Sequence, residues 1–287
     1  MELAIISGKG GTGKSSISAA FASVIKNHVL TDCDVDAANM HILFQPKREE
    51  SFVYISGSKA EVNYDICTGC GICSEHCRFG AITMQEQVPV ISEVSCDGCF
   101  LCSRICPVEA IKMTPNDKSR MYIGSYRYGK MVFGILSPGE ENSGRLVNMV
   151  KEKAREIKKE HKLEHILIDG PPGIGCPVIS AIAGADKVLI VTEPSLSGLH
   201  DMERAIEITS KFGIQANVLI NKFDLNTELS ERIEERCKKL NINTIGRLPF
   251  DHLMTKAMIE GKSIPEYAPG SEISKSIKDI IHKVIEA

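Results

Sequence analysis

The sequence predicts an α/β protein with a mostly parallel sheet flanked by helices, interrupted by a small α+β module. Three observations support this fold class. Short runs suited to buried strands, such as 3–6, 28–32 and 166–168, alternate with stretches suited to helices, which is the rhythm of βαβ units. A glycine-rich turn follows the first of these runs. Eight of the eleven cysteines fall within residues 67–106, where that rhythm stops.

The glycine-rich turn is a candidate phosphate-binding loop. It lies between a strand expected over 2–6 and a helix expected over 15–26, the context that such a loop requires. Its glycines let backbone N–H groups point at phosphate oxygens, and the helix N-terminus adds positive potential. Lys14 would reach the terminal phosphates, and the Ser15 hydroxyl would bind Mg²⁺. The nucleotide-binding residues expected here are Gly8, Lys9, Gly10, Gly11, Thr12, Gly13, Lys14, Ser15 and Ser16.

Acidic residues are expected at the carboxyl edge of the sheet. The second strand ends in Asp32, and Asp34 and Asn39 follow it. Ligands bind at this edge in open α/β sheets, although the segment could instead cap the next helix. A later apolar run ends in Asp169, an arrangement that places a carboxylate beside Mg²⁺. We therefore expect a magnesium site that includes Ser15 and Asp169.

Later loops complete this edge. Asn221 ends a strand expected over 216–221 and could read the adenine edge, although Asn221 and Asp224 also fit the Asn-Lys-x-Asp guanine motif of GTPases. The base identity therefore stays open between ATP and GTP at this point. We expect another loop to cap the helix that follows it, and its residues are Glu140, Glu141 and Asn142.

Residues 67–82 and 96–111 form an internal repeat that aligns without gaps. Each copy has the spacing Cys-x-x-Cys-x-x-Cys-x-x-x-Cys of a two-cluster bacterial ferredoxin, in which the fourth cysteine binds the other copy's cluster. A zinc ribbon would need paired Cys-x-x-Cys units instead. We expect two 4Fe–4S clusters, one on Cys67, Cys70, Cys73 and Cys106, and the other on Cys96, Cys99, Cys102 and Cys77.

Composition disfavours several other classes of protein. The chain has 287 residues, a net charge of −3 and only 5% aromatic residues. It therefore lacks the excess of positive charge that attracts nucleic acid and has few of the aromatic side chains on which bases stack. No apolar run is long enough to span a bilayer, and Met1 leads directly into the first strand, so we expect no signal peptide. In a cytosolic enzyme, clustered cysteines usually indicate metal rather than disulfides. We expect a cytoplasmic protein without membrane insertion, whose final apolar helix face around Ile277 and Ile281 docks on the core.

The segment Gly-Lys-Gly-Gly-Thr-Gly-Lys-Ser, residues 8–15, resembles the deviant Walker A motif of the MinD/ParA/nitrogenase iron protein group of ATPases. The resemblance implies a P-loop NTPase fold that uses ATP. It also implies a nucleotide-dependent dimer, with itself or with a paralogue, in which Lys9 acts on the nucleotide of the other subunit.

The same resemblance implies roles for other residues. Asp34 would position the attacking water and help to bind Mg²⁺, and relatives stack the base near Pro249. Cys176 lies where the nitrogenase iron protein has one cysteine of a subunit-bridging cluster, but residues 135–144 hold no second cysteine, so we expect no bridging cluster. Two switch segments are implied, with Asp32 and Asn39 in the first and Gly170 and Gly173 in the second.

Nearly the whole chain resembles MinD-superfamily ATPases that carry an inserted ferredoxin domain. Residues 1–54 and 119–287 would form the ATPase domain, and residues 55–118 the inserted 2×(4Fe–4S) ferredoxin-like domain. This implies an ATP-hydrolysing protein in which nucleotide state gates electron transfer to a redox partner. Two alternatives stay open. One is an iron–sulfur carrier or maturation factor that serves an acceptor protein, and the other is a MinD-like positioning or scaffold ATPase with a structural or sensing module.

Overall fold

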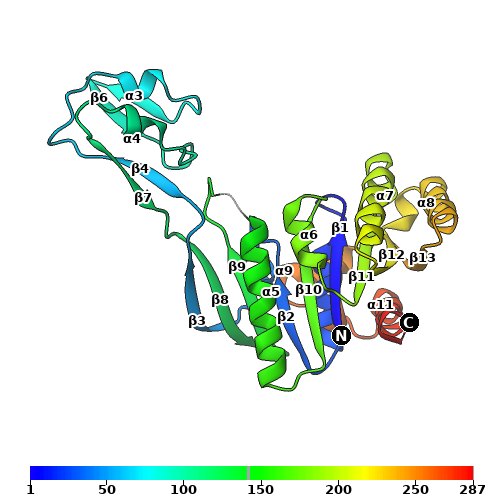
Figure 1. Ribbon diagram of the computed structural model, residues 1–287. Coiled ribbons are helices and arrows are strands. Elements are labelled where there is room, and N and C mark those ends of the chain that lie inside the picture. The colour runs from blue at the N-terminus through cyan, green and yellow to red at the C-terminus, as the bar shows by residue number, and fades with distance from the viewer. Residues whose placement is uncertain (141–142, 287) are drawn as a thin grey trace. The chain divides into compact units, whose positions relative to one another are not determined.

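The computed structural model of the protein describes residues 1–140 and 143–286 (Figure 1). Glu141 and Asn142, which we expected to cap a helix, lie outside the described residues. The chain divides into two compact units. Unit 1 comprises Met1–Ser51, Met121–Gly134 and Gly144–Ala287, and unit 2 comprises Phe52–Arg120 and Ile135–Ser143.

Unit 1 is organised around a sheet whose strand order is β13-β12-β11-β1-β10-β2-β9-β8-β3. The pairs from β13 to β9 are all parallel, as predicted for the α/β class. The strands are β1 Glu2–Ser7, β2 His28–Asp32, β3 Lys47–Tyr54, β8 Ser119–Tyr126, β9 Gly129–Ile135, β10 His165–Pro172, β11 Lys187–Thr192, β12 Gln215–Asn221 and β13 Asn243–Leu248. The central strands are almost continuously apolar because both faces of a parallel sheet are buried.

Helices cover both faces of this sheet. Figure 1 shows α5, α6 and α7 on one face, and α1 packs with α10 and α11. Right-handed crossovers explain this division, because the chain runs from β1 to β2 in the opposite direction to its path from β10 to β13. The helices of unit 1 are α1 Lys14–Val24, α2 Met40–Phe44, α5 Ser143–Glu160, α6 Cys176–Ile182, α7 Leu196–Lys211, α8 Thr227–Lys239, α9 His252–Ile259, α10 Ile264–Tyr267 and α11 Glu272–Glu286, with a 3₁₀ turn η1 at Phe223–Leu225.

The final helix docks on the core as expected. Ile277 and Ile281 of α11 are buried, and the helix packs against β13 and α1. Among the helices of residues 1–140 and 143–286, none is both long enough and apolar enough to cross a membrane.

Unit 2 contains two short antiparallel strand pairs and two short helices. The strands β4 Ser58–Val62 and β7 Ile111–Pro115 pair with one another, as do β5 Ile82–Gln85 and β6 Val88–Ile91. The helices α3 Ile72–Glu75 and α4 Leu101–Ile105 occupy equivalent places in the two copies of the repeat.

Two glycines at equivalent positions of the repeat fix its turns. Gly69 and Gly98 have φ of +70° and +68°, a backbone region that favours glycine. A Cβ at Gly69 would lie 2.4 Å from the Gln87 carbonyl oxygen, and one at Gly98 would lie 2.3 Å from that of Ser58. The close approach of another backbone therefore requires glycine at both positions.

Candidate functional site

The loop between β1 and α1 lies at the carboxyl edge of the sheet. Gly11 and Gly13 have φ of +83° and +90°, so the turn depends on glycine. A Cβ on Gly13 would lie 2.4 Å from the Asn221 Nδ2 atom, whereas Gly10 and Gly11 face open space. Gly8 is packed against Asp201. The loop thus has a tightly packed base and an open surface at which phosphate oxygens can approach.

Lys14 and Asp169 form a buried ion pair at the end of β10. The Lys14 Nζ atom lies 2.9 Å from the Asp169 Oδ1 atom, and the two side chains are 6% and 0% exposed. The hydroxyls of Ser15 and Ser18 donate to the same carboxylate at 3.0 and 2.6 Å. Burial opposes the charge on Lys14, but Asp169 outweighs it, so the pKa of Lys14 lies above its ordinary value. The expected Lys14, Ser15 and Asp169 are therefore brought together, and Ser18 joins them.

Asp32 shapes the loop that follows β2. Its buried carboxylate accepts hydrogen bonds from the backbone N–H groups of Asp34 at 3.2 Å, Asn39 at 3.0 Å and Met40 at 2.9 Å. Burial, followed by the nearby charge of Asp169, raises the pKa of Asp32 to about 7. The Asn39 Nδ2 atom reaches the Ser15 hydroxyl at 3.4 Å. Asp32 thus organises the loop, while Asn39 links it to the phosphate-binding turn.

The second expected switch segment continues β10 past Asp169. A Cβ on Gly170 would lie 2.8 Å from the Cγ2 atom of Ile6, so the chain runs close to β1 there. Gly173 has φ of +93° and donates its N–H to the Ser7 carbonyl at 2.9 Å. This segment is therefore fastened to the strand that precedes the phosphate-binding loop.

Lys9 lies apart from Lys14 and is held by the loop after β11. Its Nζ atom lies 2.8 Å from the Glu193 Oε1 atom and donates to the hydroxyls of Ser195 and Ser197 at 2.9 and 3.0 Å. The Glu193 Oε2 atom binds Lys222 Nζ at 2.9 Å. Burial opposes the charge of Glu193, but the two ammonium groups keep its pKa below the ordinary value.

A pocket opens beside the loop, at the ends of β12 and β13. Asn221 lines it but donates its Nδ2 atom to the Thr12 carbonyl at 2.8 Å. One N–H group of this amide is thus engaged with the phosphate-binding loop, and the amide oxygen and the second N–H group remain for other partners. The pocket is lined by Gly11, Gly13, Ser16, Asn221, Lys222, Pro249, Phe250, Asp251, Met254, Thr255 and Met258.

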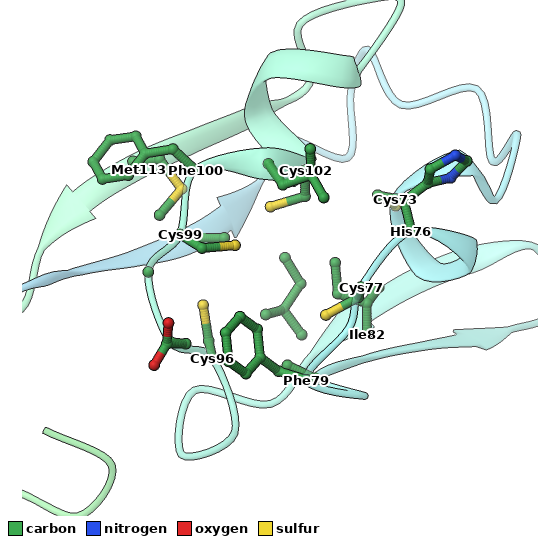
Figure 2. Close-up of a pocket in the computed structure, with 16 residues that line it drawn as sticks. Cys73, His76, Cys77, Phe79, Ile82, Cys96, Cys99, Phe100, Cys102 and Met113 are labelled. Atoms are coloured by element: carbon green, nitrogen blue, oxygen red, sulfur yellow. The ribbon is translucent and has the colours of Figure 1, made fainter.

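The eight clustered cysteines of unit 2 line two pockets. Cys67, Cys70, Cys73 and Cys106 line one of them, together with apolar residues such as Pro89 and Ile111. Figure 2 shows the other, into which the sulfurs of Cys77, Cys96, Cys99 and Cys102 point, Cys102 from α4 and the others from loops. Ile82, Phe79 and Met113 add apolar surface to this second pocket, whose lining Cys73 also reaches. Across the part of the chain that the structure describes, no three His, Cys, Asp or Glu side chains form a group that could hold a metal ion.

Comparison with known proteins assigns the nucleotide site to a family. Residues 3–264 match the model of the CobQ/CobB/MinD/ParA nucleotide binding domain. The chain belongs to this family. It is a MinD/ParA-superfamily P-loop ATPase, and the α/β P-loop NTPase fold that we predicted is confirmed.

Relatives of this ATPase differ in how much of the chain they match. An uncharacterized protein of Methanocaldococcus jannaschii is 37% identical over 293 residues, which cover 100% of this chain and 97% of that protein. Nitrogenase iron protein 2 of Methanothermococcus thermolithotrophicus is 27% identical and covers 53% of this chain and 56% of its own length. The septum site-determining protein MinD of Bacillus subtilis is 25% identical, with corresponding shares of 52% and 58%.

A solved structure of the cell division ATPase MinD of Pyrococcus furiosus aligns with a TM-score of 0.59 and 17% identity, covering 99% of this chain and 98% of that one. At this identity the alignment supports the fold alone. The roles of individual residues in the MinD/ParA-type site therefore rest on the geometry described above.

Proposed function

We propose that this MinD/ParA-type ATPase is a nucleotide-driven switch whose output is carried by unit 2. The convergence of Lys14, Ser15 and Asp169 is the observation that carries the ATPase assignment. Lys14 would exchange its bond to Asp169 for phosphate oxygens and stabilise the charge that develops during phosphoryl transfer. Ser15, Asp34 and Asp169 would hold Mg²⁺, whose charge neutralises the phosphates when it is bound. Asp34 would also orient the attacking water.

We assign the opening step to the pair formed by Lys9 and Glu193. Lys9 can reach the nucleotide of another subunit only after it leaves Glu193, Ser195 and Ser197. A second protomer that presents ATP phosphates offers a stronger partner for an ammonium group than one carboxylate shared with Lys222. The chain would therefore form a dimer when ATP is bound, either with a second copy of itself or with a paralogue.

We also propose that unit 2 is a ferredoxin-like domain that holds two 4Fe–4S clusters. Two observations support this proposal: the lining of each pocket includes the four cysteines expected for one cluster, with Cys73 lining both, and apolar side chains line both pockets. The four thiolates around a cubane cluster lie farther apart than the ligands of a single metal ion. Cysteines that are spaced too widely to bind one ion can therefore still bind a cluster. When bound, such clusters accept and give up single electrons.

The output of the switch has three candidates. The names of the MinD relatives favour a positioning or scaffold ATPase, and the comparisons support this reading better than electron transfer. The two thiol pockets favour electron transfer to a redox partner. An iron–sulfur carrier or maturation factor would release its clusters to an acceptor, although eight ligands within one chain favour retention.

The ATPase proposal is tested by phosphate release from anaerobically purified protein with Mg-ATP. The Asp34→Ala variant should bind ATP and dimerise but lose about 100-fold or more in kcat. Asp117, an acidic residue of unit 2, provides the matched control Asp117→Ala, which should hydrolyse ATP like the wild type. Equal rates in Asp34→Ala and wild type would show that another group positions the water.

The three candidate outputs predict different behaviour of the clusters, which can be measured. Anaerobic protein should contain about eight iron atoms and eight sulfide ions per chain. Rapid loss of iron to an apo-acceptor and chelator would favour the carrier, and ATP-dependent reduction of an acceptor would favour electron transfer. ATP-dependent binding to a cellular target that persists in protein stripped of iron would favour the positioning role.

A further inference from the structure

A buried carboxylate joins the loop after β9 to unit 2. Ile135–Ser143 belongs to unit 2, although most of β9 and nearly all of α5, on either side of it in the chain, belong to unit 1. The Glu140 side chain is 2% exposed. It accepts hydrogen bonds from the Ser56 hydroxyl at 2.5 Å and from the Asn116 Nδ2 atom. Ser56 precedes β4 and Asn116 follows β7, and because these strands are antiparallel, one carboxylate bridges the two strands at the same end of the pair.

Lys59 connects Glu140 to the cysteine loop of the second repeat. Its Nζ atom lies 3.6 Å from the Glu140 Oε1 atom and donates to the backbone carbonyls of Gly139 at 2.7 Å and Cys96 at 2.8 Å. The Lys59 side chain is buried as well. Cys96 lines the pocket of Figure 2, so the ammonium group is bound to the backbone of a proposed cluster ligand. We call Ser56, Lys59, Asn116 and Glu140 the root clasp.

The segment that carries Glu140 is closely fitted to unit 2. Gly139 has φ of +75°, and a Cβ there would lie 2.3 Å from the Val94 carbonyl oxygen. The Ser137 N–H group donates to the Ser119 hydroxyl at 3.0 Å. Breaking a buried ion pair is costly when one charge is left without its partner, and such pairs are better suited to fixing an arrangement than to adding stability. The root clasp is therefore suited to holding the segment that carries Glu140 in one arrangement, which is lost when Glu140 leaves.

The chain beyond this segment leads back to the nucleotide site. Gly144 lies in the first turn of α5, and a Cβ there would lie 3.2 Å from the Ser180 hydroxyl of α6. Helix α6 follows the segment from Asp169 to Gly173. A movement of that segment on ATP binding would therefore reach the start of α5, which follows Glu140 closely in the sequence.

We propose that the root clasp couples the nucleotide state of the ATPase to unit 2. In the arrangement described here, Glu140 neutralises Lys59 beside Cys96. When Glu140 withdraws, the ammonium group is uncompensated, which favours the more negative, reduced state of a cluster bound there. The clasp thus sets a lower reduction potential when closed and a higher one when open. The effect on the reduction potential rests on the proposed clusters. The mechanical effect, which is the loosening of the chain around Ser56 and Asn116, does not depend on them.

The mechanical part is tested by hydrogen exchange on the full chain. The Glu140→Gln variant keeps the size of the side chain but removes its charge, and exchange over residues 56–59 and 114–118 should become about tenfold faster. Glu93 pairs with Lys118 on the surface of the same unit, so Glu93→Gln is the matched control and should leave exchange unchanged. Mg-ATP should move the wild-type rates toward those of Glu140→Gln. Equal rates in all three proteins, or wild-type rates that ignore bound ATP, would overturn the clasp.

The electrostatic part is tested by a dithionite titration followed by EPR. Glu140→Gln should shift one of two midpoint potentials to a more positive value, and Lys59→Met should shift the same one to a more negative value. Glu93→Gln should shift neither. Unchanged potentials in both clasp variants would refute the charge effect. Wild-type protein without iron and sulfide would instead refute the cluster proposal together with the charge effect, while hydrogen exchange would still decide the mechanical part.

Discussion

Lys9 and Glu193 form an ion pair within one chain, with 2.8 Å between the Lys9 Nζ and Glu193 Oε1 atoms. We propose that this lysine acts on the nucleotide of a partner subunit. Glu193 also binds Lys222, which donates to the Gly11 carbonyl at 2.7 Å. The loop after β11 therefore holds both Lys9 and the phosphate-binding loop, and dimer formation must compete with this arrangement.

Replacing Lys9 should separate ATP binding from ATP hydrolysis. In the Lys9→Ala variant, Lys14 and Ser15 are intact, so the affinity for ATP should stay within about threefold of wild type. The dimer should be lost, and kcat should fall by about 100-fold because one cation no longer reaches the transferred phosphate. Light scattering and phosphate release measure both. The Glu193→Gln variant binds Lys9 less tightly and should form dimers at a lower ATP concentration. Normal turnover in Lys9→Ala would contradict the proposal that Lys9 acts on the nucleotide of the other subunit.

The buried pair of Lys14 and Asp169 predicts an asymmetry in stability. Lys14→Met leaves the Asp169 carboxylate buried without a cation, and the free energy of unfolding without nucleotide should fall by about 3–5 kcal/mol. Lys14→Met combined with Asp169→Asn should recover part of this loss because no buried charge remains. Urea denaturation measures the difference. Lys211 and Glu207 pair on an exposed surface, so Lys211→Met should unfold like the wild type. A small effect of Lys14→Met alone would mean that water reaches Asp169.

Exchange of the fourth cysteine between the two repeats makes a specific prediction for cluster content. Cys106 lines the pocket of Cys67, Cys70 and Cys73, although it belongs to the second repeat. Cys106→Ser should lose about half of the iron and sulfide and give the same EPR spectrum as Cys70→Ser. Cys176→Ser in unit 1 should keep the full content. If the Cys106→Ser spectrum matched that of Cys99→Ser instead, Cys106 would bind the cluster of its own repeat, and the proposed exchange of ligands would be wrong.

His28 predicts acid sensitivity of unit 1. The side chain is 1% exposed, and its Nε2 atom lies 2.5 Å from the Tyr126 hydroxyl oxygen. Burial lowers the pKa of His28 to about 4, against 6.5 for an ordinary histidine. At this position the unfolded chain therefore binds more protons between these values, so the contribution of His28 to stability is complete above pH 6.5 and is reduced by about 3 kcal/mol at pH 4. The raised pKa of Asp32 acts in the opposite direction but is common to all variants, so the contribution of His28 is the difference between wild type and His28→Phe. Urea denaturation across this range should show that difference, with His200→Gln, an exposed control, behaving like the wild type. An equal pH dependence in wild type and His28→Phe would assign the acid sensitivity to other groups.

The sequence could predict the features that depend on local pattern. The loop at residues 8–15 and Asp169 follow apolar runs, and parallel strands bring their carboxyl ends to one edge. The contact of Lys14 with Asp169 is a consequence of that topology. Likewise, the repeat of the cysteines leads to equivalent helices α3 and α4.

The remaining features depend on contacts between distant parts of the chain. Nothing in the local pattern around Glu140 indicates that it reaches Ser56 and Asn116, because these residues are 84 and 24 positions away in the sequence. The engagement of Asn221 with Thr12 arises only when β12 and the phosphate-binding loop meet. Glu193 gave no signal either, since a Glu-Pro pair after a strand is an ordinary loop sequence.

We propose that ATP and the cysteine-rich unit 2 act together, and EPR spectra of the dithionite-reduced protein with and without Mg-ATP decide whether they do. Mg-ATP should change the spectrum and the midpoint potential of one cluster in wild type, and should change neither in Lys14→Ala. Identical spectra in wild-type protein that demonstrably binds and hydrolyses ATP would show that nucleotide and clusters act independently.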